Sequence, residues 1–197
     1  TEKNGVTLKS LGRNALNFLS LTGKLTLPAK IKFDGTSIFT IGYLTSVDNG
    51  DGELTEGFIY GRKADGTVDN TYLYGYSGAK KENVQIPSTI KIIGNSAFHY
   101  SEIKSVIIPE GVETIGDNAF TICHLTGKVV IPSTVTYIGR NAFQKYNPWV
   151  LMNSDLVEIV NKTGRVFDWK AITDGPTEAT FETGVVENWY GDITITK

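Results

Sequence analysis

The chain has 197 residues, of which 40% are hydrophobic and 20% charged, so its composition is that of a folded protein and not of a disordered one. Nineteen Lys and Arg against 21 Asp and Glu leave a formal net charge of −2, which offers no basic surface for nucleic acid or an anionic membrane. No apolar run approaches the ~18 residues that a membrane span needs, and a single cysteine excludes an internal disulfide framework and any multi-cysteine metal site.

A motif recurs along the chain with a period of 22 to 23 residues. It reads Ile-Pro-x-x-Val-x-x-Ile-Gly-x-x-Ala-Phe, with Ile for Val in the first copy, and three clear copies end at Phe98, Phe120 and Phe143. Two weaker copies run through about residues 7–44 and a partial one starts at Leu156, so the chain holds about six units. One such unit cannot bury enough apolar surface to fold alone, so we expect the units to stack on one another.

Each unit predicts a short strand, a chain reversal and a buried aromatic ring. In the second clear copy, alternation turns Ile107 to one face of the strand and its two neighbours to the other, and the following proline ends the strand. Gly116, seven residues after that proline, is expected where the chain reverses with a positive φ. The Asn-Ala-Phe sequence then predicts a helical or 3₁₀ turn that places Phe120 in the core.

This pattern resembles the BspA-type leucine-rich repeat of bacterial surface proteins, over about residues 7–44 and 84–169. The resemblance implies a leucine-rich-repeat solenoid, right-handed and β-rich α/β, with a parallel sheet on its concave face and short helical or 3₁₀ turns. Family members are mostly secreted or cell-surface proteins, and several are implicated in adhesion. The resemblance therefore implies an extracellular or cell-surface bacterial protein whose partner is a protein or glycoprotein of the host matrix or of another bacterium.

Two segments depart from the repeats. Residues 45–83 lie where one step of the repeat should be, and alternating aromatic runs on either side of residues 63–67 predict a β-hairpin insertion there. Two further alternating runs within residues 170–197 predict a C-terminal β cap that hides the last coil. The expected domains are therefore the solenoid, residues 1–169 with its insertion, and the cap; because no cap precedes Leu8, further chain upstream is also expected.

The insertion provides the first candidate binding surface. Alternation places its aromatic side chains on one face and Ile59 and Leu73 on the other. Tyrosine combines apolar area with a polar tip and is favoured at interfaces. The alternative is that this face packs against the solenoid. The aromatic residues of the predicted face are Phe58, Tyr60, Tyr72, Tyr74 and Tyr76.

The repeat strands provide the second candidate surface. The residue between the two inward positions of each strand should line the open sheet, and three of these five residues are β-branched and apolar. The alternatives are a plain preference for β-branched residues in strands, or cover by the insertion. The five positions are Thr26, Gln85, Ile107, Val130 and Val160.

Residues suited to catalysis or metal binding are scarce. Residues 48–53 are rich in oxygen ligands, but their spacing is not that of a calcium loop, so we expect a turn and keep calcium as the alternative. His99 and His124 occupy different repeat positions and are expected at the surface or at an edge, while the resemblance places Cys123 inward as a small buried residue. No nucleophile with an oriented base can be assigned, so we predict neither an enzyme nor a cofactor or metal.

These observations predict a non-catalytic binding module that recognises a protein or glycoprotein, with adhesion implied by the resemblance. Two other hypotheses stay open. The chain can be a structural spacer whose aromatic residues serve only its core, or the targeting module of a larger extracellular enzyme.

Overall fold

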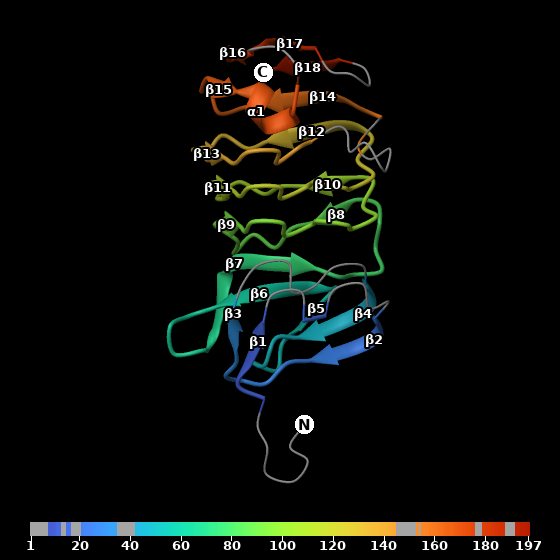
Figure 1. Cartoon of the computed structure of the whole chain (residues 1–197), viewed down its shortest axis with the longest axis vertical. Helices are drawn as coiled ribbons and strands as arrows, with labels where there is room; N and C mark the ends of the chain where they lie inside the picture. Colours follow the sequence, from blue (N-terminus) through green and yellow to red (C-terminus); the bar gives the residue numbers. More distant parts are fainter. Residues whose placement is uncertain are drawn as a thin grey trace.

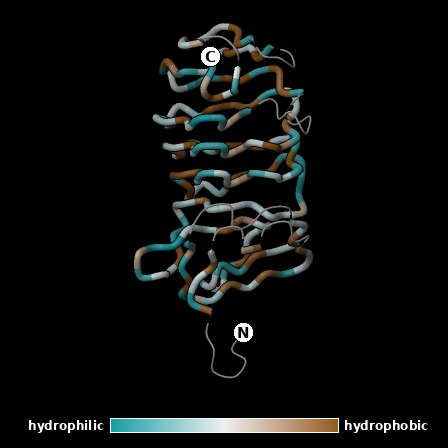
Figure 2. The backbone as a smooth tube through the Cα atoms, in the orientation of Figure 1, coloured by the Kyte–Doolittle hydropathy of each residue, from teal (hydrophilic) through white to brown (hydrophobic). Residues whose placement is uncertain are grey.

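The chain forms a stack of coils along one long axis, with its N-terminal strands near one end and the C-terminus near the other (Figure 1). Hydrophobic and hydrophilic residues alternate along each coil (Figure 2), as expected when one side of each strand faces a core. This is a computed structural model, and it describes residues 8–12, 15–16, 21–34, 42–144, 153, 155–175, 179–187 and 192–197.

Two columns of short strands run along the stack. The Val-x-Ile-Pro segments form the first column, in which Val84 pairs in parallel with Val106 and Val130 with Val160. The last strand of the chain joins this column in parallel and pairs antiparallel with the strand before it. Its strands are β8 (Val84–Gln85), β10 (Val106–Ile107), β12 (Gly127–Ile131), β14 (Leu156–Asn161), β18 (Ile193–Thr196) and β17 (Gly184–Val186).

The Ile-Gly segments form the second column, a sheet of five strands. Four of them are parallel, and the fifth joins antiparallel at the N-terminal end of the column. In order, these strands are β6 (Phe58–Arg62), β7 (Val68–Tyr76), β9 (Ile92–Ile93), β11 (Thr114–Ile115) and β13 (Tyr137–Ile138).

The N-terminal part has its own sheets and its own small core. Its strands form a parallel pair and a three-stranded sheet with the order β2-β4-β5. The small core contains Ile31, Leu44 and Val47, and it is separate from the main core of the repeats. The strands are β1 (Ser10–Gly12), β2 (Leu21–Thr26), β3 (Lys32–Asp34), β4 (Gly42–Asp48) and β5 (Leu54–Thr55).

Aromatic rings stack through the centre of the main core. The repeat phenylalanines Phe98, Phe120 and Phe143 are fully buried, as predicted. Their ring centroids are 4.8 Å and 5.0 Å apart, and both pairs of rings are nearly parallel. Each ring therefore packs on the equivalent ring of the next coil, which is how stacking stabilises units that cannot fold alone.

The repeat glycines do not have the positive φ that the sequence predicted. In the second clear copy the positive φ belongs to Asn118, at 55°, two residues after Gly116. A Cβ on Gly116 would lie only 2.7 Å from the backbone nitrogen of Asn95 in the preceding coil. The prediction was wrong because this glycine is required by the close approach of two coils, whereas the turn uses an asparagine, which tolerates the left-handed region.

One strand of the predicted insertion belongs to the repeat sheet. β7 pairs with β6 as an antiparallel hairpin, but it also pairs in parallel with β9, where Tyr72 lies opposite Ile92. The ring of Tyr76 lies 5.3 Å from that of Phe98, so it extends the stack of repeat rings by one. Residues 45–83 are therefore only partly an outgrowth, because β7 supplies the second-column strand and the core ring of a repeat.

The C-terminal segment continues the stack beyond the last clear repeat. The short helix α1 (Trp169–Thr173) accepts hydrogen bonds from the backbone of that repeat, from Asn141 N–H at 2.7 Å and Phe143 N–H at 3.0 Å. An antiparallel pair, β15 (Phe167–Asp168) and β16 (Thr180–Phe181), lies beside it. Among the described residues no helix has the length and apolar character needed to cross a membrane.

Candidate functional site

The outward side chains of the first column form a row across its strands. Gln85 lies opposite Ile107, Val130 lies opposite Val160, and β10 lies beside β12 (Figure 1). We call these four residues the outer strip. Ile107 is 49% exposed, and Val130 and Val160 are half-buried. Four of the five residues predicted for this row thus share one column.

The fifth residue predicted for this row lies elsewhere. Thr26 is exposed on β2 and pairs with Asp48 of β4, in the separate N-terminal sheet. Polar groups lie next to the apolar part of the strip: Glu158 lies opposite Lys128 and accepts a hydrogen bond of 2.7 Å from the hydroxyl of Thr196. An apolar centre with a polar rim is the usual anatomy of a protein-binding surface.

The aromatic residues of the insertion do not form one exposed face. Phe58, Tyr60 and Tyr76 are at most 9% exposed and belong to the main core, which is the alternative considered for this surface. Tyr74 packs instead on the small N-terminal core, 4.5 Å from the ring of Phe33. Tyr72 is half-buried.

Two irregularities in the β6–β7 pairing explain this difference. The register shifts on both sides of Tyr60, so Tyr60 lies opposite Leu73 and shares the main core with it. Uninterrupted alternation would have placed these two side chains on opposite faces. Such a shift redirects every later side chain of the strand, which is why simple alternation was wrong for this hairpin.

A hollow brings part of the predicted aromatic face and part of the outer strip together. It has a volume of about 440 Å³ and lies between the end of β5 and the end of β8. Phe58, Tyr60 and Gln85 all line it, so members of both predicted surfaces meet there. Next to them Leu54, 58% exposed, is one of the most exposed large apolar side chains.

A second apolar row lies on the second column and was missed by the sequence reasoning. Tyr72, Ile92, Thr114 and Tyr137 lie opposite one another across four strands, and Tyr137 is 53% exposed. These residues precede the isoleucine or leucine that points into the core. The alternation that found Ile107 would have found Ile92, Thr114 and Tyr137 if it had been applied to the Ile-Gly strand.

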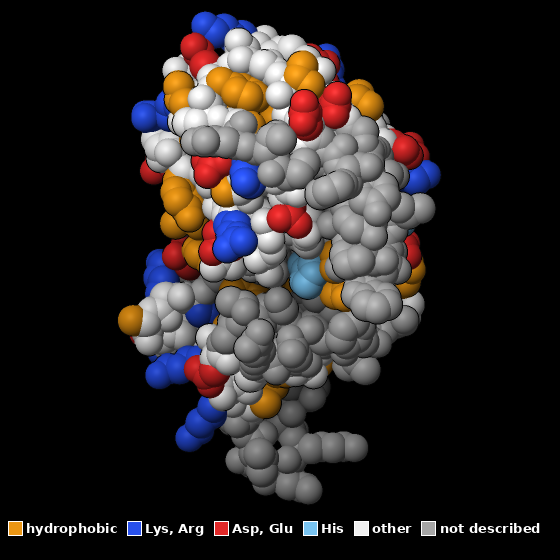
Figure 3. Space-filling view, turned by 45° about the horizontal axis from the view of Figure 1, so that its top comes forward, with side chains coloured by type: hydrophobic (Ala, Val, Ile, Leu, Met, Phe, Trp, Pro, Cys, Tyr) orange, Lys and Arg blue, Asp and Glu red, His pale blue; other side chains and the backbone are white. Residues whose placement is uncertain are grey.

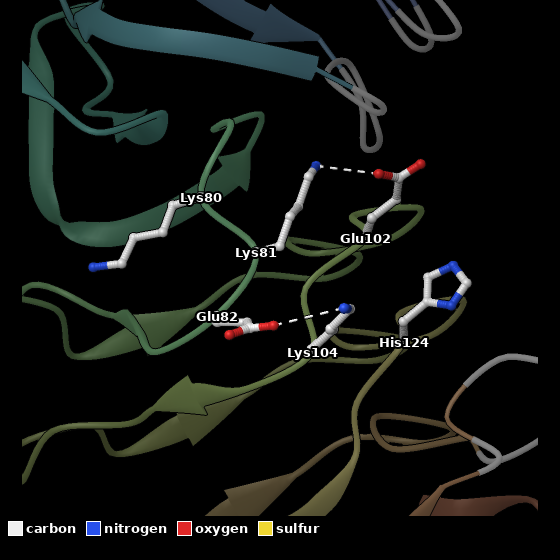
Figure 4. A pocket seen from close by; sticks show the side chains of 6 residues that line it. All are labelled: Lys80, Lys81, Glu82, Glu102, Lys104 and His124. Atoms are coloured by element: carbon white, nitrogen blue, oxygen red, sulfur yellow. Dashed lines mark ion pairs between the residues drawn. The ribbon is translucent and has the colours of Figure 1, made fainter.

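Another hollow, with a volume of about 730 Å³, is lined mainly by charged side chains. Figure 4 shows Lys81 pointing toward Glu102 and Lys104 toward Glu82, with 3.6 Å between the charged atoms of each pair. His124 also lines this hollow and is exposed. Because each of these lysines faces a glutamate of the neighbouring coil, the hollow presents paired charges of both signs.

Two residues that line this hollow, Lys81 and Glu102, also contact the N-terminal sheet. The hydroxyl of Tyr43 on β4 donates a hydrogen bond of 3.1 Å to Glu102, which raises the pKa of Tyr43, and the ammonium of Lys81 lies 4.5 Å from its ring centre. On the face shown in Figure 3, basic and acidic side chains are interspersed. This cluster is therefore best explained as a polar contact between two parts of the fold.

The remaining candidate groups lie apart from one another. Cys123 is fully buried, as predicted, and burial raises its pKa to about 12, so the nucleophilic thiolate is disfavoured. Burial lowers the pKa of His99. Asp48 accepts the backbone N–H groups of Gly50 and Gly52, which lowers its pKa and is the bonding of a turn. The described part of the chain contains no cluster of three acidic, histidine or cysteine side chains able to hold a metal.

Comparison with known proteins identifies the repeats. Residues 67–161 match the family described as BspA type leucine-rich repeat region, in six copies. This part of the chain is therefore a BspA-type leucine-rich repeat region, and the match begins inside the predicted insertion, just before β7. No curated protein sequence matches the chain.

Three solved bacterial proteins have similar structures. A leucine-rich repeat protein from Eubacterium ventriosum is 22% identical over 70% of this chain, with a TM-score of 0.51. The pneumococcal vaccine antigen PcpA is 20% identical over 85% of this chain, with a TM-score of 0.52. A leucine-rich cell surface protein from Faecalibacterium prausnitzii is 17% identical over 81%, with a TM-score of 0.45. This chain spans 36%, 46% and 44% of their respective lengths.

Proposed function

We propose that this chain is a non-catalytic binding module of a secreted or cell-surface bacterial protein, and that it recognises a protein or glycoprotein through the outer strip. The observation that carries the proposal is the row of β-branched side chains across the first column, with Ile107 half exposed at its centre. Repeats are suited to this role because stacking extends one face along several units.

Two further observations support the proposal. The buried, protonated Cys123 is unsuited to nucleophilic chemistry. The repeat family and the shared fold of a pneumococcal vaccine antigen support a location outside the cell. Adhesion to host matrix or to other bacteria is the specific role that we propose.

Binding of the purified chain to immobilised matrix proteins and to bacterial cells tests this function. Ile107→Glu places a charge at the centre of the strip and should weaken binding at least about tenfold, which corresponds to about 1.4 kcal/mol. Val166→Glu is the matched control, because Val166 is 59% exposed and lies outside the strip, in the loop before β15. Its affinity should stay within about twofold of the original chain.

Two results would contradict the proposal. If the Ile107 and Val166 variants bind equally well, the outer strip is not the recognition surface. If the original chain binds neither matrix proteins nor cells, the structural-spacer hypothesis gains.

A further inference from the structure

The pair Asn49–Gly50, which follows β4, is chemically labile. In an asparagine–glycine pair the backbone nitrogen of the glycine can attack the side-chain amide carbon of the asparagine, because glycine has no Cβ to hinder the approach. Asparagine is accordingly among the residues that limit the lifetime of proteins at high temperature. The chain has one other such pair, Asn4–Gly5, which lies outside the described residues. The surroundings of Asn49 decide whether it can react.

The side chain of Asn49 is held by two hydrogen bonds. It is fully buried, its Nδ2 donates to the C=O of Phe58 at 3.0 Å, and its Oδ1 accepts the N–H of Tyr60 at 2.8 Å. Its own backbone C=O accepts the guanidinium of Arg62 at 2.7 Å. The amide group is therefore kept away from water and fixed in one orientation for as long as these contacts last.

The attacking nitrogen is held as well. The N–H of Gly50 donates to the carboxylate of Asp48 at 2.9 Å. Attack requires the loss of this proton, and the negative charge of Asp48 beside it disfavours that loss. Both reacting groups are therefore kept unreactive by the fold, and the reaction requires this segment to open.

The fold requires both members of the labile pair. Gly50 has a φ of 95°, and a Cβ at this position would collide with the carbonyl of Pro28. Asn49 donates and accepts at the same time, which an amide can do and a carboxylate cannot. The contacts that stabilise this junction between β4 and β6 therefore depend on a pair that becomes reactive when the junction opens.

We propose that Asn49 is a latent modification site, which deamidates when the chain unfolds and then prevents the native junction from forming again. The nitrogen of Gly50 bonds to Cγ of Asn49, and ammonia leaves with the proton of that nitrogen. Water then opens the cyclic imide at either carbonyl and gives aspartate or isoaspartate. The net change converts an amide and water into a carboxyl group and ammonia, with no oxidation or reduction. This inference does not depend on the partner of the outer strip.

The products do not fit the native site. A carboxylate at position 49 can accept the N–H of Tyr60, but it cannot donate to the C=O of Phe58. It is also a buried charge without a cationic partner among its hydrogen bonds, which is costly. Isoaspartate in addition lengthens the main chain between β4 and β5. A chain that stays unfolded should therefore lose the ability to restore this junction.

Tryptic digestion and mass spectrometry measure the reaction at Asn49 alone. Trypsin cleaves after lysine and arginine, so it releases residues 33–62, in which Asn49 is the only side-chain amide, and residues 4–9, in which Asn4 is the only one. In guanidinium chloride at mildly alkaline pH, both peptides should deamidate at rates within about threefold of each other. In the folded chain, residues 33–62 should react at least about 100-fold more slowly than in denaturant, which corresponds to an opening free energy of about 2.7 kcal/mol.

Melting temperatures measure the consequence of the modification. The chain kept in denaturant until residues 33–62 are deamidated, and then returned to buffer, should melt at least about 2 °C below the fresh chain. Asn49→Ala is the matched control, because it lacks the amide and should keep its own melting temperature within about 1 °C after the same treatment. Asn49→Asp carries one of the two products and should melt at least about 2 °C below the original chain without any treatment. If Asn49→Ala does not refold, Asn49→Asp and the tryptic peptides decide the question.

Any of three results would overturn the inference. The first is an unreacted Asn49 in denaturant over the time in which Asn4 deamidates. The second is an equal rate of deamidation of Asn49 in the folded and the unfolded chain. The third is an equal loss of melting temperature in the treated original chain and the treated Asn49→Ala variant, because the damage would then lie at another residue.

Discussion

At the scale of single residues, the stacked aromatic rings connect one coil to the next through the core. Phe120 lies between Phe98 and Phe143 and is fully buried, so its ring contacts equivalent rings on both sides. Tyr137 lies in the next repeat, on β13 of the second column, and is 53% exposed. Loss of the two side chains should therefore have very different effects on the free energy of unfolding.

Phe120→Ala should lower the free energy of unfolding by about 3–5 kcal/mol, because it leaves a cavity in the middle of the ring stack. Tyr137→Ala, an aromatic residue on the outer face, should cost less than about 1 kcal/mol. Urea unfolding followed by circular dichroism measures both. Similar losses in the two variants would mean that the ring stack is not the main support of the array.

The only cysteine of the chain, Cys123, is buried in the same core as the ring stack. Cys123 is buried, its thiol donates to the backbone C=O of Phe98 at 3.1 Å, and burial raises its pKa to about 12. In the unfolded chain a thiol ionises near its ordinary pKa of about 8.5. Unfolding should therefore change both the exposure and the ionisation of this group.

Labelling of Cys123 by iodoacetamide should be at least about 100-fold slower in the folded chain than in denaturant. Raising the pH from 7 to 9 should increase the rate strongly in the unfolded chain, because its thiol ionises in this range. Labelling of the folded chain through direct attack should stay slow, since its folded pKa lies higher. Fast labelling of the folded chain at pH 7 would contradict the buried position of Cys123.

At the scale of elements, a buried asparagine holds the β6–β7 hairpin against the N-terminal sheet. Asn49 follows β4, and its amide group donates to the C=O of Phe58 at 3.0 Å and accepts the N–H of Tyr60 at 2.8 Å. These contacts lie where the pairing of β6 with β7 is irregular. The asparagine thus satisfies a backbone group of β6 beside the bulge.

Asn49→Ala should destabilise the chain by about 1–3 kcal/mol, because it leaves the buried N–H of Tyr60 without a partner. The C=O of Phe58 should be less affected, since it also accepts the hydroxyl of Thr55 at 2.6 Å. Asn70→Ala is the control, because Asn70 is exposed on β7 and its loss should cost less than about 0.5 kcal/mol. Thermal unfolding compares the two, and equal melting temperatures would exclude this role for Asn49.

At the scale of the whole molecule, the chain combines a repeat array with an N-terminal part that has its own core. The main core extends from β6 and β7 through all the later coils, whereas Ile59 and Tyr74 face the small core. The β6–β7 hairpin therefore contributes side chains to both cores and joins them. The hollow of about 440 Å³ lies beside this hairpin, and β5 and β6 interrupt the regular order of strands between β4 and β7.

The sequence by itself determined the repeating unit. The positions of Phe98, Phe120 and Phe143 in the core and the outward position of Ile107 follow from local alternation and from the 22-to-23-residue period. Local patterns succeed here because each coil repeats the environment of the one before it. The step of 22 residues back from Phe98 to Tyr76 is also in the sequence, and it would have assigned Tyr76 to the ring stack.

Only the tertiary structure decided how the irregular parts are arranged. The shifted register that turns Tyr60 into the main core depends on how β6 meets β7, and alternation along one strand does not contain that information. The need for Gly116 arises from the approach of a neighbouring coil. The hollow of about 440 Å³ is lined by the ends of β5 and β8, two strands that are distant in sequence. These features depend on contacts between segments, whereas the repeating unit is specified within each segment.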